Sequence, residues 1–266
     1  MLVKADELIK AGRLDEALAE LNGAIRAKPD DSRLRVFLFQ LNCVLGRWDK
    51  ALTQLGVLAD LSIETKLLAQ VFQPVIHCEM LRGEVFAGRT TPIIFGEPLD
   101  WVGSLVQANV LLAQGNARAA AELRDRAFDA APASAGTIDG QPFAWMADAD
   151  TRLGPVLELI FEGKYYWVPF CRIKRIVIEG PKDLRDLVFL PAQFVWTNGG
   201  EATAHIPTRY AGTEKSGDDL LALARKTEWR EEPEGFAIGL GQRLLATSEG
   251  DYPLLDGKLI DFSDAS

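Results

Sequence analysis

The stretch Gly12–Leu18 reads GRLDEAL, and GRWDKAL follows at Gly46–Leu52, 34 residues further along the chain. This spacing is the period of tetratricopeptide repeats, in which each repeat is a pair of helices. The glycine of each copy suits the end of a first helix, because glycine adopts the left-handed backbone without Cβ strain. Asp15 and Asp49 then fall in the first turn of the second helix, where a carboxylate accepts hydrogen bonds from free backbone N–H groups. The repeat predicts an N-terminal array of helix pairs.

Helical periodicity continues beyond the two copies. A long helix is expected at Ile63–Phe86, perturbed at Pro74, because apolar residues recur there every three or four positions. Another helix is expected at Leu99–Ala113, and a looser third copy of the repeat signature follows at Gln114–Ala120. We therefore predict a tetratricopeptide-like helical domain over residues 1–131.

The period of the apolar residues changes to two after a linker of small residues at Ala130–Gly136. Such alternation is typical of strands with one buried face. Strand-like runs occur at Phe143–Asp150, Val156–Phe161, Tyr165–Phe170, Ile173–Ile178, Leu187–Leu190, Gln193–Thr197, Ala202–Ile206, Gly239–Thr247 and Lys258–Phe262. One helix is expected at about residues 217–226, and the rest of residues 138–266 is expected to form a small, mostly antiparallel β domain. The predicted fold class is α+β.

The charge balance excludes one class of function. The 266 residues carry 29 Lys and Arg against 38 Asp and Glu, a net charge of −9, and most of the acidity lies in residues 136–266. A nucleic-acid-binding protein needs a basic surface to neutralise phosphates, so nucleic acid is not expected as a partner. The hydrophobic fraction of 48% and the charged fraction of 25% are those of an ordinary globular protein.

Neither membrane insertion nor secretion is expected. The most apolar stretch, Val71–Cys78, is far too short to span a bilayer, and the N-terminus lacks the apolar core of a signal peptide. The three cysteines, Cys43, Cys78 and Cys171, are widely separated and suggest no disulfide framework. These features predict a protein of the reducing cytoplasm.

Neither a metal ion nor a cofactor is expected. The two histidines, His77 and His205, lie in different predicted domains. His77 and Cys78 are neighbours on a predicted helix, so their side chains point about 100° apart and make a poor pair of metal ligands. We interpret His77 and Cys78 as packing residues, and His205 as a residue of the sheet.

Asp148, Asp150 and Arg152 form the most distinctive polar group. On a strand, the period of two places all three on one face, which suits a carboxylate–guanidinium network. Two neighbouring carboxylates can also bind a metal ion or share acid–base chemistry. The chain has no glycine-rich phosphate loop or nucleophile motif to accompany such a site. A structural network is the favoured interpretation, with contact to a partner protein as one alternative and a hydrolase or ligand-binding enzyme as the other.

Aromatic residues supply the candidates for partner binding. Tyr165 and Trp167 point to one face of a predicted strand, and Tyr166 and Phe170 point to the other. Packing in a sheet core is the ordinary interpretation, whereas an exposed pair of Tyr165 and Trp167 would anchor a partner protein. Trp101 is a further candidate for either role.

Two strings of residues give a specific resemblance to a known family. They are WMADADTRLGP at Trp145–Pro155 and YYWVPF at Tyr165–Phe170, and they are followed by Arg209-Tyr210 and by Thr227-Glu228-Trp229. Placed after the helical repeats, these residues resemble the ImpE/SciE family, the TagJ-type accessory proteins encoded with type VI secretion systems. The similarity extends over nearly the whole chain.

The resemblance implies a non-catalytic role. It implies binding to the small subunit of the contractile sheath, through a short helical segment of that subunit. It also implies an influence on sheath assembly, or on sheath recycling by a Clp-type unfoldase. A helical repeat array offers a groove for such a segment. We therefore expect a cytoplasmic adaptor, with a general peptide-binding scaffold as a further alternative to the enzyme.

Overall fold

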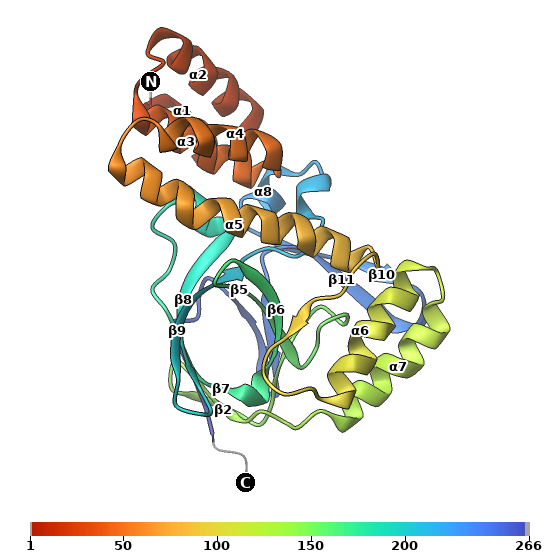
Figure 1. Cartoon of the computed structure of the whole chain (residues 1–266). Coiled ribbons are helices and arrows are strands. Elements are labelled where there is room, and N and C mark those ends of the chain that lie inside the picture. The colour runs from red at the N-terminus through yellow and green to blue at the C-terminus, as the bar shows by residue number, and fades with distance from the viewer. Residues whose placement is uncertain (1, 264–266) are drawn as a thin grey trace.

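The N-terminal part of the chain is an array of stacked helices. The computed structural model of the chain describes residues 2–263. The helices of the array are α1 (Leu2–Lys10), α2 (Leu14–Ala27), α3 (Ser32–Val44), α4 (Trp48–Ala59) and α5 (Ile63–Phe86). They lie side by side, with α5 between the repeats and the sheets (Figure 1). The tetratricopeptide-like array is confirmed, and α5 has the bounds that its periodicity predicts.

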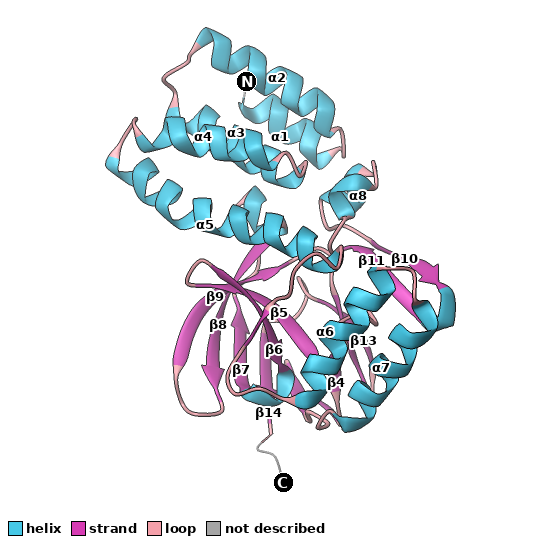
Figure 2. Cartoon of the chain, turned by 45° about the vertical axis from the view of Figure 1, so that its right-hand side comes forward, coloured by secondary structure: helices cyan, strands magenta, loops and turns pink. Residues whose placement is uncertain are grey.

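Two further helices, α6 (Asp100–Ala113) and α7 (Ala117–Ala130), form a hairpin beside the sheets (Figure 2). The hairpin reproduces the predicted helix and the third copy of the repeat signature. No helix within residues 2–263 has the length and the apolar character that crossing a membrane requires.

The glycines of the repeated signature end helices as predicted. Gly12 has φ = 69° and Gly46 has φ = 63°, both in the left-handed region. The predicted capping of the following helices by their own aspartates does not occur, since neither α2 nor α4 has a side-chain cap at its first residues. Instead, Leu14 N–H donates to Asp219 Oδ2 at 2.9 Å. A residue from the C-terminal half therefore caps the first backbone N–H group of α2, the second helix of the first repeat.

Most of the C-terminal half forms one curved, nine-stranded sheet. Its strands are β1 (Ile93–Ile94), β2 (Gly136–Ile138), β3 (Gln141–Phe143), β5 (Val156–Phe161), β6 (Lys164–Pro169), β7 (Ile173–Ile178), β8 (Phe189–Trp196), β9 (Glu201–Pro207) and β14 (Leu259–Phe262). The order is β1-β6-β5-β9-β8-β7-β14-β2-β3, and every neighbouring pair is antiparallel except β1 with β6. The sheet curls into a barrel-like shape (Figure 1). The mostly antiparallel, sheet-rich C-terminal part is confirmed.

Two smaller sheets complete this half. One contains β4 (Met146–Asp148), β12 (Leu244–Thr247) and β13 (Gly250–Pro253). The other is a ribbon of β10 (Thr227–Glu232) and β11 (Phe236–Gly241), preceded by the short helix α8 (Asp219–Ala222).

Three details differ from the predicted runs. Parts of the predicted runs Leu187–Leu190 and Gln193–Thr197 join in one strand, β8, whereas Leu187 ends a short 3-10 helix (Leu184–Leu187). Pro191 does not interrupt β8, because it lies just beyond the part that pairs with β7 and removes no hydrogen bond from that ladder. The run at Gly239–Thr247 is split between β11 and β12, since Gly241 turns the backbone with φ = 85°. The helix expected before the ribbon is reduced to the four residues of α8, and no predicted run corresponds to β10.

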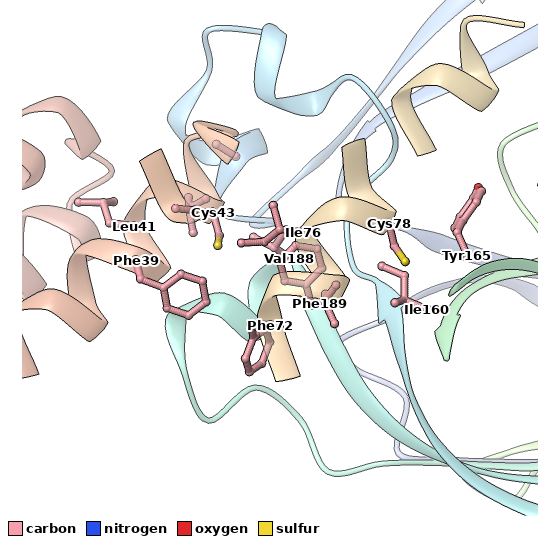
Figure 3. Packing of buried hydrophobic residues seen from close by; sticks show 14 of the residues in the cluster. Phe39, Leu41, Cys43, Phe72, Ile76, Cys78, Ile160, Tyr165, Val188 and Phe189 are labelled. Atoms are coloured by element: carbon pink, nitrogen blue, oxygen red, sulfur yellow. The ribbon is translucent and has the colours of Figure 1, made fainter. Parts of the chain in front are cut away.

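The helices and the curved sheet share one apolar core. Ile76 of α5 belongs to the same buried cluster as Ile160 of β5 and Tyr165 of β6 (Figure 3). On the opposite face of these strands, Leu159 and Val168 belong to a second cluster inside the curved sheet. Both faces of β5 and β6 are therefore buried, and the first core runs across the expected domain boundary.

Replacing Ile76 with Ala should destabilise the helices and the sheet together. Ile76 is 0% exposed, and truncating a buried isoleucine costs about 2–5 kcal/mol. Urea unfolding followed by far-UV circular dichroism and by tryptophan fluorescence should give coincident transitions, both shifted to lower denaturant. Leu67→Ala, on the exposed side of the same helix, is the control and should change the free energy of unfolding by less than about 0.5 kcal/mol. Separate transitions for the two signals would contradict a shared core.

Candidate functional site

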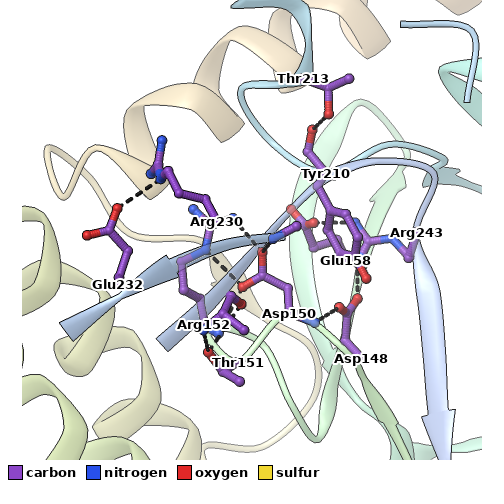
Figure 4. Close-up of polar contacts among 12 residues, drawn as sticks. Asp148, Asp150, Thr151, Arg152, Glu158, Tyr210, Thr213, Arg230, Glu232 and Arg243 are labelled. Atoms are coloured by element: carbon purple, nitrogen blue, oxygen red, sulfur yellow. Dashed lines mark hydrogen bonds and ion pairs between the residues drawn. The ribbon is translucent and has the colours of Figure 1, made fainter. Parts of the chain in front are cut away.

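The predicted polar group of Asp148, Asp150 and Arg152 lies where β4 ends and a tight turn begins (Figure 4). The expectation that the strand continues through all three residues is wrong. Asp150 N–H donates to Asp148 Oδ1 at 2.9 Å, and Arg152 N–H donates to Asp150 Oδ1 at 3.0 Å. Each aspartate side chain therefore accepts a hydrogen bond from the backbone N–H group two residues later, which is the pattern of an Asx turn. All three residues are buried.

Asp150 and Arg152 form a bidentate ion pair. Arg152 Nε donates to Asp150 Oδ1 at 2.9 Å, and Arg152 Nη2 donates to Asp150 Oδ2 at 2.6 Å. Gly239 N–H of β11 donates to Asp150 Oδ2 at 3.0 Å. The Arg152 guanidinium lies 4.3 Å from the centre of the Phe86 ring of α5. The turn is thus fixed to the ribbon on one side and to the long helix on the other.

Asp148 pairs with Arg243 rather than with Arg152. The Arg243 guanidinium donates to Asp148 and to Glu158 of β5, and its Nε donates to the Pro207 carbonyl at 2.9 Å. Arg243 lies between β11 and β12 and is 0% exposed. One guanidinium therefore joins β4, β5 and the end of β9.

Glu158 also pairs with Arg82, which belongs to α5. Arg82 Nε and Nη2 donate to the two oxygens of Glu158 at 2.6 and 2.8 Å, and Arg82 Nη1 donates to Glu79 Oε1 at 2.9 Å. The Tyr165 hydroxyl donates to Glu158 Oε1 and accepts from Trp167 Nε1 at 2.7 Å. The long helix is thereby tied to the same carboxylate that Arg243 holds. These contacts form, with those of the turn, the buried charge network.

Sequence reasoning misses four charged members of the network, namely Glu79, Arg82, Glu158 and Arg243. Glu158 gives one usable signal, because it stands within the apolar run Val156–Phe161, where a lone carboxylate needs a buried partner. Nothing local to Arg82 or Arg243 distinguishes a buried arginine from an exposed one.

The three aromatic candidates for partner binding are buried. The exposed fraction is 8% for Trp101 and 0% for Tyr165 and Trp167. Tyr165 and Trp167 lie on the face of β6 that packs in the core shared with α5. Their burial agrees with the ordinary interpretation of core packing and not with the alternative of exposed anchors, which a period of two leaves open because it reveals two faces but not which face a helix covers. Within residues 2–263, Trp145 and Trp229 are the more exposed tryptophans, at 42% and 37%.

The network shifts the acidities of its carboxyl groups in opposite directions. Burial raises the pKa of Asp148 to about 7, although Arg243 opposes the shift. For Glu158, burial is outweighed by Arg82 and Arg243, and its pKa falls to about 2. Glu158 is therefore the fully charged carboxylate at the centre of the network.

Fixed donors occupy both carboxylate oxygens of Asp148, Asp150 and Glu158. Each oxygen of Asp150 and Glu158 accepts two hydrogen bonds and each oxygen of Asp148 accepts one, so these carboxylates are engaged mainly by protein donors. Within residues 2–263, no group of three or more His, Cys, Asp or Glu side chains is placed to hold a metal ion. The arrangement joins elements of the fold.

The histidines lie outside the network. Cys78 is buried, in agreement with its interpretation as a packing residue, but His77 is exposed, so the packing role expected for His77 is wrong. The ring of His205 lies 5.5 Å from that of Phe72, and burial lowers the pKa of His205. The structure does not bring these residues together.

Comparisons with known proteins cover both parts of the chain. Residues 140–261 match the profile of the family described as ImpE protein, and residues 8–61 match that of a tetratricopeptide repeat. The chain is 48% identical over 258 residues to the type VI secretion system accessory component TagJ of Pseudomonas aeruginosa, covering 97% of this chain and 90% of that protein. A crystal structure of a Vibrio parahaemolyticus protein has a TM-score of 0.90 and 25% identity, covering 98% of each chain. The helical and sheet-rich parts therefore occur together in these relatives.

Replacing Arg243 with Met should be strongly destabilising. The change leaves Asp148 and Glu158 buried without their shared cation, and breaking a buried ion pair in this way costs about 3–5 kcal/mol. Arg243→Lys should recover little, since an ammonium group lacks the planar fork that reaches several acceptors at once. Chemical denaturation measures the free energy of unfolding of each variant.

Arg175, which pairs with Asp261 at 2.5 Å on the surface, provides the control. Arg175→Met should cost less than about 1 kcal/mol, because surface ion pairs contribute little. If Arg243→Met were as mild as this control, the buried network would not hold the fold together.

Asp148→Asn should change how stability depends on pH. A carboxyl group whose pKa rises on folding, here from 3.8 to about 7, makes the protein less stable as the pH increases through that window. The wild-type protein should therefore lose free energy of unfolding relative to the Asn variant across the window, and the difference should be constant above it. Denaturant titrations at several pH values measure this difference. A difference that does not vary with pH would show that Asp148 titrates normally.

Proposed function

This chain belongs to the ImpE family, and from this premise we propose that it is a non-catalytic accessory protein of a type VI secretion system, acting in the cytoplasm by binding another protein. The helical repeats support a protein partner, because such arrays present continuous surfaces to peptides and helices. The closed charge network supports a role without catalysis, since its carboxylates are already occupied by protein donors.

An exposed aliphatic stripe on α5 carries the proposal. Ile63, Leu67 and Val71 follow one another at intervals of four residues and are 75%, 58% and 50% exposed. Residues four apart share one face of a helix. The opposite face of α5, with Phe72 and Ile76, packs in the core. Single exposed aliphatic residues are common on surfaces, but a row of three on one helix face is typical of a protein-binding surface.

A short helical segment of the small sheath subunit is the proposed occupant of this stripe. An amphipathic helix recognised in this way presents apolar side chains at the same spacing of three or four residues, so the two rows interdigitate. Through this contact the protein influences sheath assembly or recycling. Its connection with a Clp-type unfoldase is then indirect, by way of the sheath subunit.

Leu67→Glu should weaken binding of the small sheath subunit at least about ten-fold, which corresponds to about 1.4 kcal/mol. The variant places a charge in the middle of an apolar contact and leaves the core untouched, because Leu67 is 58% exposed. Isothermal titration calorimetry with the purified intact subunit measures the affinity. A subunit that lacks its N-terminal helix should not bind.

Leu259→Glu is the matched control. Leu259 is also exposed, at 37%, but it lies on β14, so this variant should bind like the wild-type protein. An unrelated amphipathic helical peptide should not bind, which distinguishes a sheath adaptor from a general peptide-binding scaffold. The proposal fails if no binding is seen at roughly tens of micromolar, or if Leu67→Glu binds as tightly as the wild type.

A further inference from the structure

The strand β10 has a free edge. It pairs with β11 on one side and with no other strand within residues 2–263. Its four central residues, Glu228–Glu231, are all exposed. The ribbon lies at the outer side of the molecule, near the α6–α7 hairpin (Figure 2). A row of backbone groups at such an edge is available to a further strand.

The hydrogen bonds of β11 identify which backbone groups of β10 are free. Alternate N–H groups of β11 point away from β10 and donate to side chains on the far side, namely Ala237 to Thr151, Gly239 to Asp150 and Gly241 to Thr213. In an antiparallel pair, the residues opposite such positions also turn their N–H and C=O groups away from the shared ladder. The opposite residues in β10 are Thr227, Trp229 and Glu231. The free edge therefore presents the N–H and C=O groups of these three residues.

The free edge carries mostly negative charge. β10 and the turn after it contain four glutamates, at positions 228, 231, 232 and 234, against one basic residue, Arg230. Arg230 is already paired with Glu232 at 2.8 Å (Figure 4). Glu231 forms no ion pair within residues 2–263. Two copies of this edge would both carry net negative charge and repel each other, whereas a basic strand is complementary to the edge.

Trp229 adds an apolar contact at this edge. It is 37% exposed, and its ring centre lies 5.5 Å from that of Tyr210, which is buried. The contact with Tyr210 holds the indole in place without covering it. In strand addition, the main chain provides affinity and alternate side chains provide selectivity. Trp229 lies on one face of the strand, and Glu228 and Glu232 lie on the other, so an incoming strand that alternates apolar and basic residues can place its apolar residues beside Trp229 and its basic residues beside these glutamates.

We propose that β10 binds an extended, basic segment of a partner protein, which joins the ribbon as a third strand. The backbone of the segment pairs with the outward N–H and C=O groups of Trp229 and Glu231, and its Lys or Arg side chains pair with the glutamates. This surface is separate from the aliphatic stripe on α5. The inference therefore stands independently of the sheath partner.

The probe is a fluorescein-labelled hexapeptide of alternating Lys and Val, and fluorescence anisotropy measures its binding to the full chain at low salt. Glu231→Pro removes an outward N–H group but no hydrogen bond of the β10–β11 ladder, a position where proline is tolerated. This variant should bind the peptide at least about ten-fold more weakly than the wild type. Glu231→Gln is the matched control, because it keeps the N–H group and loses only the charge. It should bind roughly two- to three-fold more weakly.

Two methylated peptides keep the test decisive even if Glu231→Pro fails to fold. In each peptide, every second backbone nitrogen is methylated, and the two peptides differ in which set of alternate residues carries the methyl groups. The charges are unchanged, but the backbone N–H groups along one edge of the peptide can no longer donate hydrogen bonds. The peptide whose methyl groups face β10 should bind the wild-type protein at least about ten-fold more weakly than the unmethylated probe. The proposal is overturned if both methylated peptides bind like the probe, if Glu231→Pro binds like Glu231→Gln, or if the wild-type protein shows no saturable binding.

Discussion

The structure depends on the burial of one guanidinium group, that of Arg243. Removing a charge from water is costly unless protein groups replace its hydration. Here the replacements are the carboxylates of Asp148 and Glu158 and the carbonyl of Pro207. These acceptors lie on β4, β5 and β9, which belong to two different sheets. An arrangement that separated these strands would leave a buried ion without partners, so the ion pairs favour one way of joining the sheets.

The same chemistry attaches the helical array. Arg82 of α5 shares the carboxylate of Glu158 with Arg243. Arg209, just after β9, donates to the carbonyl of Val44 at 2.7 Å. The last carbonyls of a helix have no partner within the helix, so Arg209 completes the end of α3. Together with the shared apolar core, these contacts fix the repeats on the sheet, and the exposed side of α5 becomes a rigid surface rather than one face of a flexible solenoid.

The helices could be predicted because their signals are local. A glycine at a helix end and an apolar period of three or four depend only on residues one or two turns away. Strand pairing is less local: Gly239–Thr247 reads as one run until Gly241 sends its two halves to different sheets. In the site, Asp150 and Arg152 stand two residues apart and share a turn, which makes their contact accessible to sequence reasoning. The contacts of Arg243 span 95 and 85 residues, and nothing in a single sequence marks such distant partners.

Charged residues act in opposite ways in the core and on the ribbon. In the buried network, the charged groups pair with groups of opposite sign, and these ion pairs hold neighbouring elements together. At the ribbon, Asp150 and Thr151 accept hydrogen bonds from backbone N–H groups on the side of β11 that faces away from β10. The turn that belongs to the network therefore occupies that edge of the ribbon and leaves the edge of β10 free. The same turn reaches α5 through Arg152 over the Phe86 ring. The same set of buried contacts therefore connects the helix that carries the aliphatic stripe with the ribbon that carries the acidic edge.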